Sequence, residues 1–537
     1  MNSIPATIPL SATKAPQESG LLLTLANRRW GVGLLLLVIA IWGWTDVRRR
    51  ARTSATDPLV HKTDVTVYTQ AGAALFDGRP PYEVTNPRGW HYLYPPLFAI
   101  GMAPLSLLPT TEQALVWFGV SCLCLWGACA ETRRLYQWAA EIPRGFLYSS
   151  RKVIPGQVVD YRHARLTNEI FFAAGIALVF PVLNCLQRGQ VGVPLVYLLL
   201  LGTRLALTAG TVHQLFLAGL VLALPVAIKL TPLLPVAVLA GGMLVRDLAQ
   251  LLHWSPTPPR TNRENHGQQN QTIQLSGGIL CVSGILGLAV WFLLVPGLIL
   301  GQEKNLGLLQ TWYTRVVSNQ DVGTDNDFNA RSLRNQSFAN GLRRMGNWWA
   351  YCQGTGPDDR VADDLAHRML PLPMENPAAD LTIKVVVGGV LMLLAAATLR
   401  LGMRAANQQP EAESTTIHAS SARLDWLAVF GLACTATVLV SPLSWGHHYV
   451  ICWPAMVFVP LFLASCGSER LARSLAWSAA GLLLAHYVIL DYAGRVGLLG
   501  LGMTVWYGVG VLAVLRGGGR GQANTSYRLG QPTTAGE

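Results

Sequence analysis

Apolar runs separated by polar segments recur between residues 30 and 515 of the chain. A helix needs roughly 20 predominantly apolar residues to cross a bilayer, and most of the runs have about this length. We therefore predict an all-α, polytopic membrane protein with about twelve transmembrane helices, within a range of roughly 10–13. The predicted crossings are residues 30–47, 96–130, 168–186, 191–207, 213–228, 230–246, 276–300, 383–402, 424–442, 449–466, 474–491 and 496–515.

Two of these runs need a more detailed interpretation. The run 96–130 is too long for one straight helix, and Pro104 and Pro109 predict a break after a re-entrant or interfacial piece at 96–109. The first run, "WGVGLLLLVIAIWGW", is short enough to be the core of a signal peptide. Because "TDVRRRAR" follows it instead of a small-residue cleavage site, we interpret it as an uncleaved helix.

The polar segments between the runs define the domain organisation. With the N-terminus in the cytoplasm, every unusual polar motif falls on the extracytoplasmic face. The positive-inside rule gives only weak support, because loops 131–167 and 48–95 each hold seven Lys and Arg residues. The expected organisation is a cytoplasmic segment 1–29, a transmembrane domain 30–515 with helical outer loops 48–95 and 301–382, and a flexible cytoplasmic tail 516–537.

Composition supports the membrane assignment and narrows the chemistry. Only 13% of the residues are charged, against about 25% in a typical soluble protein. The nine cysteines form no CxxC pair, so neither a zinc site nor a disulfide framework is expected, and no metal or cofactor is predicted. The net charge of +12 suits an anionic lipid surface or a phosphate-bearing substrate. Nucleic acid is not an expected partner of such a chain.

The first outer loop contains a helical pattern that starts with an acidic residue. Asp64, Tyr68, Ala71 and Leu75 recur at helical spacing, which predicts a short amphipathic helix at the membrane surface. Asp64 then either caps this helix or serves as a general base at the bilayer face. Asp77 is a competing acid, but it precedes Gly78 in what resembles a turn.

Two short motifs have both a structural and a functional interpretation. Tyr94, Pro95 and Pro96 form a stiff start to the second apolar run, and Tyr94 supplies an interfacial aromatic ring. Arg188 in "LQRGQVG" is compatible with an ordinary hairpin turn between two helices.

Three ionisable residues lie at or inside apolar runs. Lys229 interrupts "LALPVAIKLTPLLPVAV", where its ammonium either snorkels to the interface or binds a phosphate. His447 and His448 lie at a membrane boundary in "SPLSWGHHYV". Neighbouring positions on a helix point about 100° apart, which makes joint metal chelation awkward. Hydrogen bonding to a phosphate or sugar and simple interfacial packing remain open for this pair.

Five stretches, taken together and in order, resemble the polyprenol-phosphate-mannose-dependent mannosyltransferases of glycosyltransferase family 87. They are D-x3-Y-x2-A…G-x2-P-Y with YPP, then RGQ, KLTP, NQS with a downstream Arg, and SPLSWxHHY. The resemblance covers roughly residues 60–465. It implies a membrane enzyme of the GT-C class that uses a lipid-phosphate sugar outside the cytoplasm, with an acid of the first outer loop as catalytic base.

The resemblance also implies roles for individual residues. Asp64 would be the catalytic base. The donor phosphate and sugar would be bound by Lys229, Arg188, Arg343 or Arg344, His447 and His448. Further motif residues of the loops and the membrane interface are Tyr68, Tyr82, Tyr94, Pro95, Pro96, Gln190, Asn335 and Gln336.

The chemistry of such a reaction fits these residue types. One carboxylate suffices to deprotonate an acceptor hydroxyl, because a phosphate leaves without protonation by an acid partner. The expected function is inverting transfer of a sugar, by the family resemblance mannose, at the extracytoplasmic face of the plasma (inner) membrane. The expected partners are a polyprenyl-phosphate sugar donor, a lipid or glycan acceptor, and membrane lipids. A transporter or lipid flippase is the alternative, although such proteins often carry repeated halves, and a polytopic assembly protein is a third.

Overall fold

The computed structural model describes residues 29–140, 161–253, 275–318, 335–345, 377–407, 416–489, 494 and 497–517, apart from residues 55, 58, 59, 88 and 344. This part of the chain is all-helical, with only isolated β-bridges beside the helices. Most of the segment 1–29 and of the tail 516–537, both predicted to be cytoplasmic, lies outside the described residues, as do parts of the loop 301–382.

Eight helices of the described chain are long and apolar enough to cross a membrane, and three shorter apolar helices accompany them. The structure therefore confirms a polytopic, all-α membrane protein, while the finer count of about twelve crossings stays a prediction. The helices of the bundle, long and short together, are α2 (Arg29–Arg50), α5 (Thr110–Ala139), α6 (Tyr161–Arg188), α7 (Gly192–Leu207), α8 (Val212–Ile228), α9 (Leu233–His253), α10 (Ser276–Ala289), α15 (Pro377–Asn407), α16 (Thr416–Val440), α17 (Trp453–Ser465), α18 (Glu469–Val488) and α20 (Leu498–Gly517).

The long second run breaks as the prolines predict. It folds into α4 (Pro96–Met102), a short 3-10 turn η3 (Ala103–Leu107), and then α5, which starts directly after Pro109. Pro109 itself adopts extended backbone angles, because its ring cannot donate the hydrogen bond that a continuous helix requires. The interfacial piece and the crossing are therefore separate elements.

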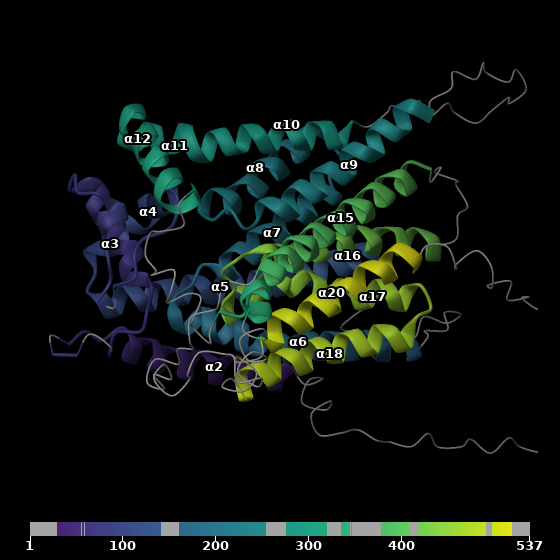
Figure 1. The fold of residues 1–537 in the computed structure, drawn as a ribbon, viewed down its shortest axis with the longest axis horizontal. Helices are drawn as coiled ribbons and strands as arrows, with labels where there is room; N and C mark the ends of the chain where they lie inside the picture. The colour runs from purple at the N-terminus through teal and green to yellow at the C-terminus, as the bar shows by residue number, and fades with distance from the viewer. Residues whose placement is uncertain are drawn as a thin grey trace, which may run out of the picture.

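A second layer of short helices covers one end of the bundle (Figure 1). It consists of α3 (Val65–Phe76), α4, α11 (Val295–Leu300) and α12 (Gln302–Trp312). A hydrophobic core of its own, separate from the core of the bundle, includes Tyr68, Tyr94 and Phe98. In this cap, α3 and α12 come from the two predicted outer loops, whereas α4 is the predicted interfacial piece and α11 ends the predicted crossing 276–300.

The expectation of an amphipathic surface helix after Asp64 is wrong in one respect. Nine of the twelve residues of α3 are buried, because α3 packs against α4 and η3 on one side and against α5 on another. Gly72 permits this close packing, since a Cβ atom there would lie 2.6 Å from the backbone oxygen of Ala99. α3 is thus an interior element of the cap and lacks the single exposed polar face of an amphipathic surface helix, while its position relative to the bilayer stays a prediction.

The bundle core lies around α16 and α17. In each of their candidate membrane spans, Ser421–Val440 and Gly446–Ser465, 89% of the residues are buried inside the protein, whereas the value is 17% for Ser276–Leu300. The two helices approach closely at Gly431, where a Cβ atom would lie 2.6 Å from the Cα atom of Ala455. The short 3-10 segment η8 (Gly446–Cys452) precedes α17 at the capped end and carries the two adjacent histidines.

Candidate active site

The turn after α6 is pressed against the start of α3. Gly189 has φ +70, and a Cβ atom there would lie 2.1 Å from Cγ2 of Val65, so both the backbone and the space demand glycine. Trp117 donates its indole N–H to the Gly189 carbonyl oxygen at 2.9 Å. The turn Arg188–Gln190 is therefore fixed beside the residues that open α3.

Asp64 is held by this turn from two sides. Its backbone N–H donates to the carbonyl oxygen of Arg188 at 2.8 Å, and its carboxylate oxygen Oδ2 accepts a hydrogen bond from the side-chain amide of Gln190. Nε of Arg188 lies 3.6 Å from the same Oδ2 atom. Asp64 occupies the N-cap position of α3, yet its side chain makes no capping hydrogen bond. Helix capping therefore does not explain the carboxylate.

Arg188 lies against two indole rings from distant segments. Its guanidinium carbon is 4.6 Å from the ring centroid of Trp90 and 5.1 Å from that of Trp445. The side chain of Arg188 is 12% exposed. Arginine prefers such aromatic faces because its planar cation is attracted to the ring electrons.

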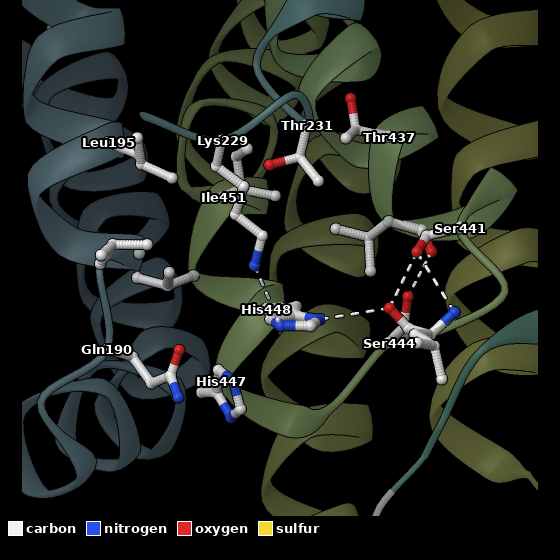
Figure 2. Close-up of a pocket in the computed structure, with 15 residues that line it drawn as sticks. Gln190, Leu195, Lys229, Thr231, Thr437, Ser441, Ser444, His447, His448 and Ile451 are labelled. Atoms are coloured by element: carbon white, nitrogen blue, oxygen red, sulfur yellow. Dashed lines mark hydrogen bonds between the residues drawn. The ribbon is translucent and has the colours of Figure 1, made fainter. Parts of the chain in front are cut away.

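A pocket lies between α7, the turn after α8, the end of α16 and η8 (Figure 2). Lys229 points into it and does not snorkel outward: its Nζ lies 3.4 Å from Nε2 of His448 and 5.7 Å from the ring centroid of Tyr94. The pocket is lined by Gln190, Val191, Gly192, Leu195, Lys229, Thr231, Thr437, Val438, Ser441, Leu443, Ser444, His447, His448, Val450 and Ile451.

Lys229 has an environment that changes its acid–base behaviour. It follows the last residue of α8 in extended backbone geometry, at the start of a turn. Burial lowers the pKa of Lys229 from 10.5 to about 8, although the nearby Cys185 and Asp64 oppose the shift. A buried ammonium of this kind gains from an anion placed beside it.

The two histidines differ in their contacts. Their rings lie 4.5 Å apart and nearly perpendicular. His448 has Nδ1 at 3.3 Å from the carbonyl oxygen of Leu443, while its Nε2 faces Lys229. His447 is buried and lines the pocket together with Gln190. The pair therefore contributes imidazole nitrogens to one pocket wall and does not form a chelating pair on one helix face.

The motif Asn335–Ser337 braces the loop that carries the histidines. Asn335 forms an antiparallel bridge with Trp445, and its side-chain oxygen accepts the backbone N–H of Ser444 at 3.1 Å. The backbone N–H of Gln336 donates to the Ser444 carbonyl oxygen at 2.7 Å. Neither Asn335 nor Gln336 lines the pocket. Both act on the shape of the loop before η8.

Buried tyrosines flank the carboxylate. The hydroxyl groups of Tyr68 and Tyr94 lie 3.3 Å apart, and Tyr82 donates its hydroxyl to the Tyr94 carbonyl oxygen at 3.3 Å. Burial raises the pKa of Tyr68 and of Tyr94 well above the ordinary value of a phenol. Both phenols therefore stay protonated, and one of the two hydroxyl groups donates to the other. Pro95 and Pro96, just after Tyr94, form the stiff start of α4.

Of the two predicted arginines after the NQS motif, the structure describes only Arg343. Arg343 forms an ion pair with Asp380 at 2.8 Å, and both side chains are half-buried. Arg343 is not among the residues that line the pocket. Arg344 lies outside the described residues. The structure thus gives no support for a donor contact by Arg343.

Sequence reasoning missed several residues that the fold brings to the site. Trp90 and Trp445 contact Arg188, and Thr231 and Ser441 line the pocket. Trp445 lies inside the SPLSWGHHY motif, so its position beside the histidines was a usable signal. Trp90 carries no such signal, because an aromatic residue in an outer loop is equally compatible with a role in the site and with simple anchoring at the membrane interface.

These features define an integral, multi-pass membrane protein whose pocket contains a lysine and two histidines. The glycosyltransferase family 87 model matches residues 92–417. This match covers more than half of the chain, so the protein belongs to glycosyltransferase family 87 and is a glycosyltransferase. The resemblance inferred from the five motifs is thereby confirmed.

One similar protein indicates a more specific activity. The polyprenol-phosphate-mannose-dependent α-(1-2)-phosphatidylinositol mannoside mannosyltransferase of Mycolicibacterium smegmatis is 24% identical over 527 residues, which cover 95% of this chain and 93% of the relative. No solved structure matches the chain. The family match includes Arg188 and Lys229 but not Asp64, His447 or His448, so for these three residues the geometry is the main evidence.

Proposed function

We propose that the protein transfers mannose from a polyprenyl-phosphate donor to an acceptor hydroxyl at the extracytoplasmic face of the plasma (inner) membrane. The observation that carries the proposal is the position of Gln190. Gln190 hydrogen-bonds the carboxylate of Asp64 and also lines the pocket that contains Lys229. Gln190 thereby links the buried carboxylate of Asp64 to the pocket that contains the buried ammonium of Lys229. This link supports a reaction that needs a base and a cation close together.

In the proposed reaction, Asp64 accepts the proton of the acceptor hydroxyl. The acceptor oxygen forms a bond to the anomeric carbon while the bond from that carbon to the phosphate oxygen breaks. The phosphate leaves on the opposite face with the electron pair, so the configuration at the anomeric carbon inverts. Lys229 balances the charge that the phosphate gains, and His448 orients Lys229. A β-linked mannosyl donor gives an α-linked product.

The surroundings of Lys229 suit a donor that arrives through the bilayer. Leu230 and Leu233, directly after Lys229, are exposed large hydrophobic residues, while the Lys229 side chain points into the pocket. A polyprenyl chain can lie on such an apolar outer surface with its phosphate directed inward to the ammonium. The short helices α7 and α8 beside the pocket fit the GT-C class of membrane glycosyltransferases, to which we assign the fold.

The acceptor is proposed from chemistry and from the similar protein. That relative is named for phosphatidylinositol mannoside as acceptor, so we propose a membrane-bound lipid or glycan hydroxyl for this chain. An acceptor of this kind, like the donor, is held at the membrane surface, where the cap lies over the pocket. Nucleotide sugars are cytoplasmic, so the sugar must reach the extracytoplasmic face on a lipid-borne donor.

The test is a transfer assay in membranes from cells that overexpress the chain, with radiolabelled polyprenyl-phosphate mannose as donor. We expect label in a new lipid or glycan product, and none above background with the empty vector or with Asp64→Asn. Intact donor that appears in the opposite leaflet without product formation would instead support the flippase alternative. Equal transfer by vector membranes would contradict the proposal.

A further inference from the structure

The contacts of Arg188 differ from those of the other basic residue at the site. Lys229 lines the pocket, whereas Arg188 does not. The Nε edge of Arg188 faces the carboxylate of Asp64 at 3.6 Å, and its plane lies against the rings of Trp90 and Trp445. The family resemblance implied that Arg188 binds the donor phosphate. Its contacts instead place it beside Asp64, the proposed base.

The three segments around Arg188 come from separate parts of the fold. Trp90 belongs to the first outer loop, Arg188 ends α6, and Trp445 directly precedes η8. The backbone of Arg188 is tied to the same place as its side chain, because its carbonyl oxygen accepts hydrogen bonds from the Asp64 backbone and from the Thr63 hydroxyl at 3.2 Å. The backbone and the side chain of Arg188 therefore both contact Asp64.

We propose that Arg188 is a positioning residue for Asp64 and not a ligand of the donor phosphate. Trp90 and Trp445 hold the guanidinium, and the guanidinium together with Gln190 holds the carboxylate toward the pocket. The inference rests on the proposed function, because it assigns Arg188 to the base of the proposed reaction. It predicts that Arg188 affects the chemical step alone, whereas Lys229 also affects binding of the donor.

Steady-state kinetics separate the two roles. Arg188→Gln should lower kcat by up to about 100-fold, the effect of a misplaced reacting group, and leave the donor KM within about twofold of the wild type. Lys229→Met should raise the donor KM. A donor KM for Arg188→Gln that rises as much as that of Lys229→Met, with kcat unchanged, overturns the inference.

Equilibrium binding provides a readout without turnover. Polyprenyl phosphate, the proposed product, should bind Arg188→Gln with wild-type affinity and bind Lys229→Met more weakly. Normal binding also shows that the variant is folded. Arg188→Lys provides a second variant, because it keeps the charge but lacks the planar group that stacks on indole rings. Weakened product binding by both Arg188 variants contradicts the inference.

The pH profile tests the contact with the carboxylate. A cation near a carboxylate favours its ionised form, so Arg188→Gln should move the acid limb of the kcat profile to higher pH. Arg188→Lys should move it less. Tyr68, Tyr94 and Lys229 also interact electrostatically with Asp64, and these residues are the same in both variants. An unchanged acid limb in Arg188→Gln contradicts the inference.

The outcome for this inference is distinguishable from the outcome for the proposed function. If the wild-type chain transfers no sugar from any polyprenyl-phosphate donor, the proposed function fails and the role of Arg188 fails with it. If the wild type is active but Arg188→Gln shows a donor defect, only the inference fails.

Discussion

The ammonium nitrogen of Lys229 lies 3.4 Å from Nε2 of His448, although 219 positions separate the two residues in the sequence. An ammonium only donates hydrogen bonds, so Nε2 of His448 accepts from Lys229. The other ring nitrogen, Nδ1, lies 3.3 Å from both the Leu443 carbonyl oxygen and the Trp445 backbone nitrogen, which hold the ring in place. His448 thereby fixes the direction of Lys229 in the pocket. This relationship makes Lys229 the residue through which donor binding is most directly tested.

Replacement of Lys229 by Met keeps the length of the side chain and removes its charge. We expect the donor KM to rise, because a hydrogen bond to a charged group contributes about 1.5–3 kcal/mol, or roughly 10–150-fold in kcat/KM. The measurement is a donor titration in purified membranes. Lys62→Met is the matched control, since Lys62 is an exposed lysine of the first outer loop and should have normal kinetics. Unchanged kinetics for Lys229→Met would assign it to membrane anchoring.

The pKa of Lys229 gives a pH dependence with a definite sign. Burial lowers this pKa to about 8, so the ammonium form is present below that pH and is lost as the pH rises through it. The kcat/KM for the donor should therefore fall as the pH increases past about 8. Lys229→Arg, which stays charged, should lack this decline. A wild-type profile that is flat across this pH contradicts the assignment.

Asp64→Asn separates the base from a structural carboxyl group. Asn keeps the shape of the side chain and caps helices about as well as Asp, but it accepts no proton. Transfer should fall on the order of 10²–10⁴-fold, which is the usual effect of losing a general base. Asp77→Asn is the matched control in the same loop, because Asp77 pairs only with the neighbouring Arg79 among the contacts described, and both are exposed. Near-normal transfer by Asp64→Asn together with loss in Asp77→Asn would move the base to Asp77.

Two glycines with positive φ test how the turn at residues 188–190 is held. Ala at Gly189 adopts a strained left-handed conformation, which costs about 1–2 kcal/mol, and also collides with Val65. Ala at Gly78 (φ +76) meets the same strain but has no atom within 4 Å of its Cβ. We expect Gly189→Ala to lower the melting temperature and the transfer rate more than Gly78→Ala does. Equal effects would mean that the contact with Val65 relaxes without moving Asp64.

Cysteine labelling tests the proposed side of the membrane. In a background that lacks the nine native cysteines, Asp77→Cys should react with an impermeant maleimide on intact spheroplasts, because Asp77 is exposed at the end of α3. Ser468→Cys, exposed between α17 and α18, should react only after permeabilisation. The opposite pattern would place the pocket on the cytoplasmic side. The native Cys352, also expected outside, lies beyond the described residues.

The helices were predictable from the sequence because their causes are local. In a bilayer each backbone polar group must be satisfied within its own helix, so an apolar run of sufficient length specifies a helix by itself. The run 191–207 corresponds to α7 (Gly192–Leu207), and the break at Pro109 appears where its ring predicts it. The family was likewise predictable from the order of the five motifs, because that order depends on the sequence alone.

The site itself was decided by the tertiary structure. Asp64 and Gln190 were both candidates, but their contact spans 126 positions and depends on how the cap packs on the turn after α6. The burial of α3 depends on α4 and α5, which no spacing within α3 reveals. Arg188 and Arg343 are the same residue type near similar motifs, yet one lies at the carboxylate and the other pairs with Asp380. A sequence specifies which groups are available, whereas the packing of distant segments determines which of them meet.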